Sequence, residues 1–462
     1  MESLGPRQRV AARNVLLADD RATMAVALVL FLVAASFSLA KTGRDALFFL
    51  QDGIFDLPFA YVGIAALSLP VAVATLSLMR RAGSRRVRVA LHLAAAAGLM
   101  GYSAVVRPGG GPLMTALFMG VPLVYNVLFA LVWLLGADLV GGRPELTQRR
   151  FYSRTGAASL AGSFAGALGA RTMTPAIAAP QLLAVAGVLL VSAGLVAAAA
   201  QRLCPPMPAV PPVAPMVRHT ARSLMQISYF WRLLAVAVAA ALTGILVEFQ
   251  FYVAASSGGR SASDNVVLFA NLYLGLAALA VIVQLFVTPA LHERIGVGGT
   301  LLVLPAAVAV LTPLTIANPS LGLRSVLRLT EGGLKSSVHR VSWERTFVGF
   351  ASRQRAAARL LIDGSAPRIA EGVAAVGLYV WLSAQERVSN ALPDGGWLGY
   401  LLLAVSASWI VLTVAMGADA KTVGPKTVPG NRTQDSPRHG PDCCPIVTEL
   451  GARVQAAEHG KL

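Results

Sequence analysis

The sequence has few charged residues and few cysteines for its length. Asp, Glu, Lys and Arg together make up 13% of its 462 residues, and only three cysteines occur, Cys204, Cys443 and Cys444. So little charge leaves too few polar side chains to coat the several water-soluble domains that this length would otherwise predict. The cysteines have no histidine at metal-ligand spacing. We therefore expect neither a zinc site nor a disulfide framework.

Several catalytic motifs are absent as well. The sequence contains no Gly-Lys-Ser/Thr loop that cradles phosphate, no nucleophile elbow and no pair of histidines at zinc-ligand spacing. An ATP-hydrolysing pump and a membrane hydrolase both depend on such motifs. We therefore predict a protein that binds a ligand without bond chemistry, is not an enzyme, and needs no metal and no cofactor.

Long apolar runs dominate what is present. Hydrophobic residues make up 56% of the chain, and the runs 23–40, 121–140 and 182–200 stand out. Each approaches the roughly 18 to 20 residues that cross a bilayer as a helix. The first run follows a basic start, as in a signal peptide, but Lys41 and Arg44 stand where a small-residue cleavage site would be. We therefore expect an all-α, multi-pass membrane protein whose first span is retained.

Charged gaps between apolar stretches divide the chain into about twelve predicted spans. They lie near residues 23–48, 57–79, 89–106, 113–140, 155–172, 180–200, 233–254, 266–290, 300–317, 320–339, 364–384 and 397–416. The predicted organisation is a cytoplasmic segment 1–22, a six-helix half 23–200, a proline-rich cytoplasmic linker 201–232, a six-helix half 233–416 and a disordered cytoplasmic tail 417–462. Two parallel six-helix halves are the architecture of major facilitator carriers.

Basic residues set the predicted orientation. The formal charge is +17, and Lys and Arg gather in the gaps after spans 2, 4, 6 and 10. Cytoplasmic loops are enriched in this way, whereas a nucleic-acid-binding module holds its basic residues on one soluble surface. We therefore expect both termini in the cytoplasm, a plasma (inner) membrane location, the lipid bilayer as a partner and no nucleic acid. The oligomeric state is left open, and a monomer is compatible with the sequence.

Three charged residues interrupt the end of the first span, in the stretch AKTGRDALFFL. Lys41 and Asp45 are one helical turn apart and are expected to pair, which leaves Arg44 free to meet an anionic ligand through its planar fork. A charge inside a bilayer costs about 2.5 to 3.5 kcal/mol on insertion scales, so its presence calls for a reason. The alternative is that the span ends near Ala40 and that these are loop charges.

The seventh span, which corresponds to the first in the other half, carries Glu248 in the apolar stretch GILVEFQFYV. A carboxylate there is a candidate for cation coupling or for contacting the donors of a substrate. The alternative is a carboxylate that a neighbouring helix neutralises for packing alone. Asn126 in the fourth span is a further candidate, although a buried Asn more often links helices than it binds a ligand.

The tenth span is the most polar. Its charged residues recur every three or four positions, and they are Arg324, Arg328, Glu331 and Lys335. Side chains at this spacing form one stripe of a helix, which can line a water-filled cavity. Beyond this span, Arg355 and Arg359 precede Asp363, with the last two one turn apart.

These charged motifs resemble those of the nucleotide carriers of the ATP/ADP translocase type, found in plastids and intracellular bacteria. The family's first helix has a basic residue, Asp and aliphatics, which GRDALFFLQDGIFDLPFAYV resembles, with Arg44 in the place of the basic residue in the substrate path. Glu248 in ILVEF is similar to the acidic residue of the family's seventh helix. The stretch SWERTFVGFASRQRAAARLLIDG resembles the family's segment after helix 10 through Glu344, Arg355, Arg359 and Asp363.

The resemblance implies nucleotide transport by ATP:ADP antiport, with two departures from the family's pattern. Asn126 stands where the family has an acidic residue, and the basic residue of the first helix is Arg44 rather than lysine. Loss of one carboxylate predicts a changed charge preference of the site. The resemblance therefore supports membership of the wider family more directly than ATP/ADP exchange itself.

The leading hypothesis is a secondary-active transporter that works by alternating access on an anionic small solute, with a nucleotide among the candidates. The predicted substrate-binding residues are Arg44, Asn126, Glu248, Arg328, Glu331, Lys335, Arg355 and Arg359, and the predicted helix-pairing or coupling residues are Lys41, Asp45, Glu344 and Asp363. The cations would donate to phosphate or carboxylate, and Glu248 and Glu331 would hold amines or a coupling proton. Two alternatives stay open: a proton-coupled carrier of another small molecule, and a non-transporting membrane scaffold or sensor.

Overall fold

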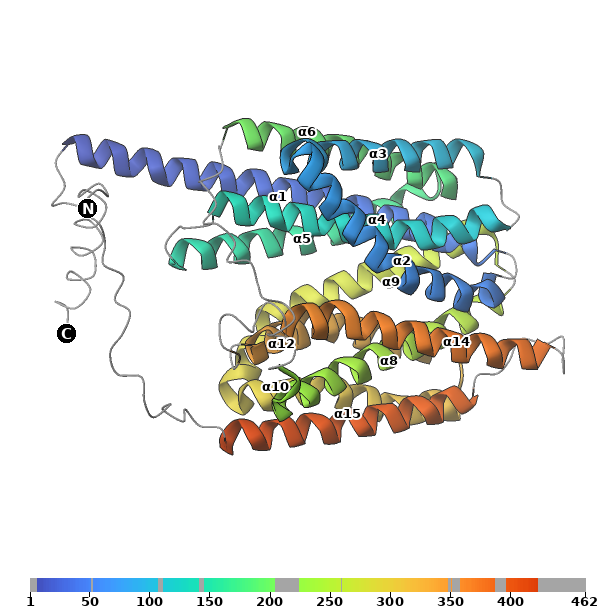
Figure 1. Ribbon diagram of the computed structural model, residues 1–462. Helices are drawn as coiled ribbons and strands as arrows, with labels where there is room; N and C mark the ends of the chain where they lie inside the picture. Colours follow the sequence, from blue (N-terminus) through green and yellow to red (C-terminus); the bar gives the residue numbers. More distant parts are fainter. Residues whose placement is uncertain are drawn as a thin grey trace. The chain divides into compact units, whose positions relative to one another are not determined.

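A computed structural model of the protein describes residues 6–50, 53–106, 111–140, 145–203, 224–258, 260–347, 350, 358–386 and 396–422 (Figure 1). Within these residues the regular structure is entirely helical. Residues Met1–Asp419 form one compact unit and Ala420–Leu462 a second. The helices that build the site all belong to the first unit.

Six helices follow one another in the described residues up to 203. They are α1 (Pro6–Phe48), α2 (Gly53–Ala82), α3 (Ser84–Val105), α4 (Pro112–Val140), α5 (Glu145–Met173) and α6 (Ala179–Leu203). Each of the first six predicted spans coincides with one of them. Since α1 continues to Phe48, Lys41, Arg44 and Asp45 lie within the helix and are not loop charges.

The later helices include three π-helical segments. In order they are α8 (Ser228–Ser256), α9 (Ala262–Ile282), η1 (Val283–Val287), α10 (Thr288–Ala317), α11 (Leu321–Leu334), η2 (Lys335–His339), α12 (Arg340–Thr346), η4 (Leu360–Ser365), α14 (Ala366–Glu386) and α15 (Gly396–Thr422). The eighth and ninth predicted spans are separated by a kink inside α10 rather than by a loop. The kink lies at Gly296, whose φ of 67° is a conformation that glycine adopts without a Cβ penalty.

Eight stretches of the described residues are long and apolar enough to cross a membrane, by length and composition. The predicted number is larger because residues 262–317 count once although Gly296 divides them, and because the more polar α5, α11 and α14 fall outside these stretches. The chain is therefore an all-α, multi-pass membrane protein.

Helices α1 and α8 are the most buried of the apolar stretches, each with 61% of its apolar window inside the protein. Helix α5 packs closely along α1, with Gly162 and Gly166 at the contact. A Cβ on Gly162 would lie 2.2 Å from the carbonyl oxygen of Phe31, and one on Gly166 would lie 2.2 Å from that of Ala35. Only glycine permits this approach of the two backbones.

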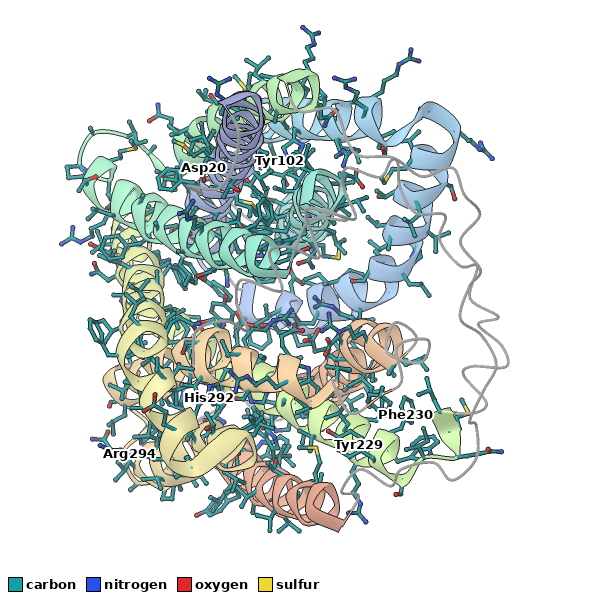
Figure 2. All side chains as sticks on the ribbon, turned by 90° about the vertical axis from the view of Figure 1, so that its left-hand side faces the viewer. Asp20, Tyr102, Tyr229, Phe230, His292 and Arg294 are labelled. Carbon is teal, nitrogen blue, oxygen red and sulfur yellow. The ribbon has the colours of Figure 1, made fainter. Side chains whose placement is uncertain are left out.

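The described helices form two groups, the first from α1 to α6 and the second from α8 to α15. The two groups are arranged in parallel and pack on each other along two seams. Asp20 near the start of the first span, Tyr229 at the start of α8 and Arg294 lie at the end of the unit that faces the viewer in Figure 2. On one seam α9 packs on α1 and α5, and on the other α14 packs on α2. The charged side chains of α1, α8 and α11 lie between these two seams.

Candidate functional site

A cavity of about 470 Å³ lies between the two groups of helices. Helices α1, α2, α4 and α5 of the first group and α8, α9, α11, η2 and α14 of the second contribute to its lining. Its charged lining residues are Lys41, Arg44, Arg328, Lys335 and Arg368 on the cationic side and Glu248, Glu331 and Glu371 on the acidic side. Six of the sequence-predicted site residues are therefore brought together here, in a cavity with an excess of cations.

The first wall of the cavity is built around a buried ion pair of neighbouring residues. The Nε of Arg44 donates to Oδ1 of Asp45 at 2.6 Å. The guanidinium of Arg44 also donates to the carbonyl of Phe118 at 3.3 Å and lies 4.0 Å over that ring. Asp45, which is fully buried, accepts further hydrogen bonds from Tyr252 and Tyr273. Arg44 is thus engaged by the protein itself.

Lys41 has a different partner from the one its spacing predicts. Its Nζ lies 3.9 Å from Oε1 of Glu248 and 4.6 Å from the centre of the Tyr273 ring. The expected pair with Asp45 is replaced because Arg44 already holds that carboxylate. The Lys41–Glu248 contact therefore joins α1 of the first group to α8 of the second.

Glu248 lies at the centre of the charged cluster. Its Oε1 is 3.0 Å from Nη2 of Arg328 and accepts a hydrogen bond from Tyr252 at 3.1 Å. Arg328 also donates to Glu331 on the next turn of α11, and Nζ of Lys335 lies 3.3 Å from Oε1 of Glu331. Cations and carboxylates therefore alternate along the cluster, with a lysine at each end.

The stripe predicted on the tenth span lines the cavity except at its first member. Arg324 is buried and donates to the carbonyl of Gln250 at 3.3 Å. Opposite the far end of the stripe, a Cβ on Gly244 would lie 2.6 Å from Nζ of Lys335. The absence of a side chain at Gly244 leaves room for the Lys335 ammonium group beside α8.

The two ends of the cavity differ. Beyond Asp45, aromatic rings from both groups of helices cover it. The Phe49 ring stacks on the Tyr252 ring with 4.4 Å between their centres, and the centres of the Phe118 and Tyr252 rings are 6.5 Å apart. At the other end the side chain of Lys335 is 44% exposed, whereas that of Asp45 is 0% exposed. The site is therefore exposed where α11 finishes and is buried under aromatic rings where α1 finishes.

The segment after the tenth span lies outside the cavity lining. Glu344 accepts from Arg359 at 2.6 Å, and the two side chains are 35% and 47% exposed. Asp363 accepts from Nε1 of Trp343 at 2.6 Å, a bond between α12 and η4. Arg355 lies outside the described residues. These contacts connect neighbouring helices of the second group.

Asn126 does not belong to the cavity lining either. It is exposed, one turn of α4 beyond Pro122, which does line the cavity. Its neighbour Tyr125 is buried and hydrogen-bonds to Ser36 of α1. In this stretch of α4 the tyrosine, not the asparagine, makes the buried polar contact with another helix.

Several residues at the site were not predicted. Tyr252, beside the cavity, and Tyr273, which lines it, hydrogen-bond the buried carboxylate of Asp45. Tyr61 lines the cavity with a hydroxyl that has no hydrogen-bond partner in the described part of the chain. Arg368 and Glu371 on α14 pair at 2.9 Å. A signal existed for Tyr252, which lies one turn after Glu248, whereas tyrosines in apolar spans otherwise look like ordinary packing residues.

Comparisons with known proteins identify the fold. No protein-family profile and no curated protein sequence matches this chain. The solved nucleoside transporter NupG aligns with a TM-score of 0.58 at 13% identity, over 87% of this chain and 99% of its own. The POT family transporter PepTSo aligns with a TM-score of 0.58 at 11% identity, over 86% and 98%. This chain therefore has the major facilitator fold, the architecture predicted from its spans.

Proposed function

We propose that this protein is a secondary-active transporter that moves an anionic small solute across the membrane by alternating access. The observation that carries the proposal is the central cavity, where five cationic and three acidic side chains surround about 470 Å³ between two groups of helices. Pockets of about 300 to 1,000 Å³ accommodate small organic ligands. The solved structures with this fold include proteins described as nucleoside and peptide transporters, which supports a solute of that size.

The cavity residues have two proposed roles. Some donate hydrogen bonds to the anionic group of the solute, and others bind or position its remaining parts. Lys41, Arg328 and Lys335 would bind carboxylate or phosphate oxygens, because each presents charged donors at the cavity. The hydroxyl of Tyr61 is available for a further hydrogen bond. Arg44 acts behind them by fixing Asp45. Nucleotides are the first candidates, since the family resemblance implies exchange of ATP for ADP.

The proposed orientation follows from the basic gaps between spans. Arg85, Arg218 and other basic residues predict that the end where α1 starts faces the cytoplasm of a plasma (inner) membrane. The closed, aromatic end of the cavity would then face outward, and the end at Lys335 would open to the cytoplasm. In this orientation both termini are cytoplasmic.

Transport by reconstituted protein tests the proposal. Liposomes that contain the full chain should take up labelled nucleotides or organic acids, and Arg328→Gln should lower the rate about 100-fold, since it removes a proposed donor to the anion. Arg359→Gln is the matched control outside the cavity and should leave the rate unchanged. Uptake of neutral solutes with exclusion of every anion would contradict the proposal.

A second candidate is a proton-coupled carrier with Glu248 as the proton site. It is favoured by the position of this carboxylate between α1 and α11, where a change of protonation alters a contact between the two groups of helices. An imposed pH gradient separates the candidates. Only this one predicts that accumulation follows the gradient and that Glu248→Gln abolishes accumulation while exchange persists.

A further inference from the structure

The two carboxylates at the centre of the cavity are held in different ways. Glu331 is 1% exposed, and its cationic partners, Arg328 and Lys335, lie on its own stripe of α11 and η2. Glu248 is 22% exposed and takes its cations from two other helices, Lys41 of α1 and Arg328 of α11. Both carboxylates line the cavity, but Glu331 is held within one stripe, whereas Glu248 is the more exposed of the two and is held by cations of two other helices.

The contacts of Glu248 all involve one oxygen. Oε1 lies 3.0 Å from Arg328, 3.9 Å from Lys41 and 3.1 Å from the hydroxyl of Tyr252. The distance to Lys41 exceeds hydrogen-bond length, so this ammonium group is attracted to the carboxylate without being saturated by it. A better-placed oxygen atom in the cavity would therefore compete for Lys41.

The cluster carries one more positive than negative charge. Its members are Lys41, Arg44, Arg328 and Lys335 as cations and Asp45, Glu248 and Glu331 as carboxylates. The pair of Arg368 and Glu371 adds no net charge. The excess positive charge faces the cavity, so one further negative charge there balances the cluster.

We infer that Glu248 is the resident anion of the substrate site: its carboxylate occupies, between Lys41 and Arg328, the place that a singly charged anionic group of the solute takes when it binds. This inference rests on the proposed function and specifies how its cargo is recognised. A carboxylate or a singly charged phosphate displaces Glu248 and bonds both cations. The displaced Glu248 is then available to an amine or hydroxyl group elsewhere on the solute.

The same exchange of partners couples binding to movement. In the empty protein, Lys41 and Glu248 attract one another across the two groups of helices, so the protein's own carboxylate stabilises the closed outer end. A solute that binds Lys41 in place of Glu248 removes this attraction. Because a ligand shifts a conformational equilibrium only by its differential contacts, the loaded protein changes state more readily than the empty one. The expected mode of transport is exchange.

Chemical rescue tests the inference without a transport assay. Glu248→Ala, made in the full chain, leaves a vacancy the size of a small carboxylate between Lys41 and Arg328. Acetate should fill the vacancy and raise the apparent Tm of Glu248→Ala by about 2 to 4 °C over acetamide at equal ionic strength. Glu344→Ala is the matched control, because Glu344 also binds two cations but does so outside the cavity, and it should show no preference for acetate.

The result that overturns the inference is equal stabilisation of Glu248→Ala by acetate and acetamide. If Glu248→Ala does not fold, Glu248→Gln replaces it, because it keeps the side-chain volume and removes the charge. Acetate must then stabilise Glu248→Gln more than the unsubstituted protein, and equal shifts overturn the inference. Rescue without any anion uptake in liposomes would instead uphold the anion site and contradict the proposed transport.

Discussion

Two clusters in this chain use the same chemistry in different surroundings. In the cavity, Glu331 is held by Arg328 and Lys335, and its side chain is 1% exposed. After the tenth span, Glu344 is held by Arg340 and Arg359, and its side chain is 35% exposed. Each carboxylate has two cationic partners. The residue types are similar, so the difference in burial determines how much each cluster contributes to the free energy of unfolding. Solvent screens the ion pairs of the more exposed cluster.

Burial changes the energy of such contacts several-fold. Removing one partner of a buried ion pair leaves an uncompensated charge and destabilises a protein by about 3 to 5 kcal/mol. An exposed pair contributes about 0 to 1 kcal/mol, because water and salt screen it. Substitutions in the two clusters therefore test whether the cavity cluster is what the structure indicates.

The largest effect is expected for Arg328→Gln. This change removes the cation shared by Glu248 and Glu331 and leaves both carboxylates short of a partner within the membrane-spanning region. The free energy of unfolding should fall by about 3 to 5 kcal/mol. Denaturation of the purified protein in detergent measures it, and a loss under 1 kcal/mol would place this cluster on a par with the exposed one.

A somewhat smaller loss is expected for Asp45→Asn. The amide keeps the size of the side chain but removes the charge that binds Arg44 and accepts from Tyr252 and Tyr273. A loss of about 2 to 3 kcal/mol follows from weakening charge-assisted bonds around a buried cation. Asp20→Asn is the control, because its partner Arg154 and Asp20 itself are exposed. Comparable losses in the two variants would contradict the burial argument.

Tyr61→Phe separates ligand binding from stability. Its hydroxyl has no partner in the described residues, so the change should leave the free energy of unfolding unchanged or slightly increased. If the hydroxyl contacts the solute, the affinity should fall about 3- to 10-fold, the value of one ordinary hydrogen bond. Titration calorimetry with the transported solute measures this, and an unchanged affinity removes Tyr61 from the site.

The smallest effect is expected in the exposed cluster. Arg359→Gln should change the free energy of unfolding by about 0 to 1 kcal/mol, and the change should shrink further at high salt. Denaturation at low and high salt measures both. A salt-independent loss of several kcal/mol would show that this cluster is buried in the membrane-embedded protein.

The sequence contains most of the fold but only part of the site. Span lengths and loop charges predict the parallel helices, and polar residues in spans 1, 7 and 10 predict three of the helices that line the cavity, α1, α8 and α11. The partners of Lys41 were not predictable, because Glu248 and Tyr273 come from helices more distant in sequence than any local spacing rule covers. Local spacing also predicts the same role for Arg359 and Arg328, although only Arg328 lines the cavity. The spacing does not separate them because burial depends on how the helices pack.

The implied kinship with ATP/ADP translocases stays a prediction. The motif around Arg44 does lie at the cavity, as the resemblance implies, whereas Glu344 and Arg359 lie outside its lining. The solved neighbours share the fold at 11 to 13% sequence identity, and identity this low carries information about the fold but not about the substrate. Substrate identity therefore depends on the transport measurements rather than on similarity.

The charge of the cavity is the central claim, and labelling of one cysteine tests it most directly. In a chain whose three cysteines are replaced by serine, Ser336→Cys places a thiol in the cavity lining beside Lys335. The account predicts that an anionic methanethiosulfonate reacts about 10-fold faster than a cationic one of similar size, relative to a free thiol, and that salt reduces the ratio. Equal rates, or faster reaction of the cationic reagent, would contradict an anion-binding cavity.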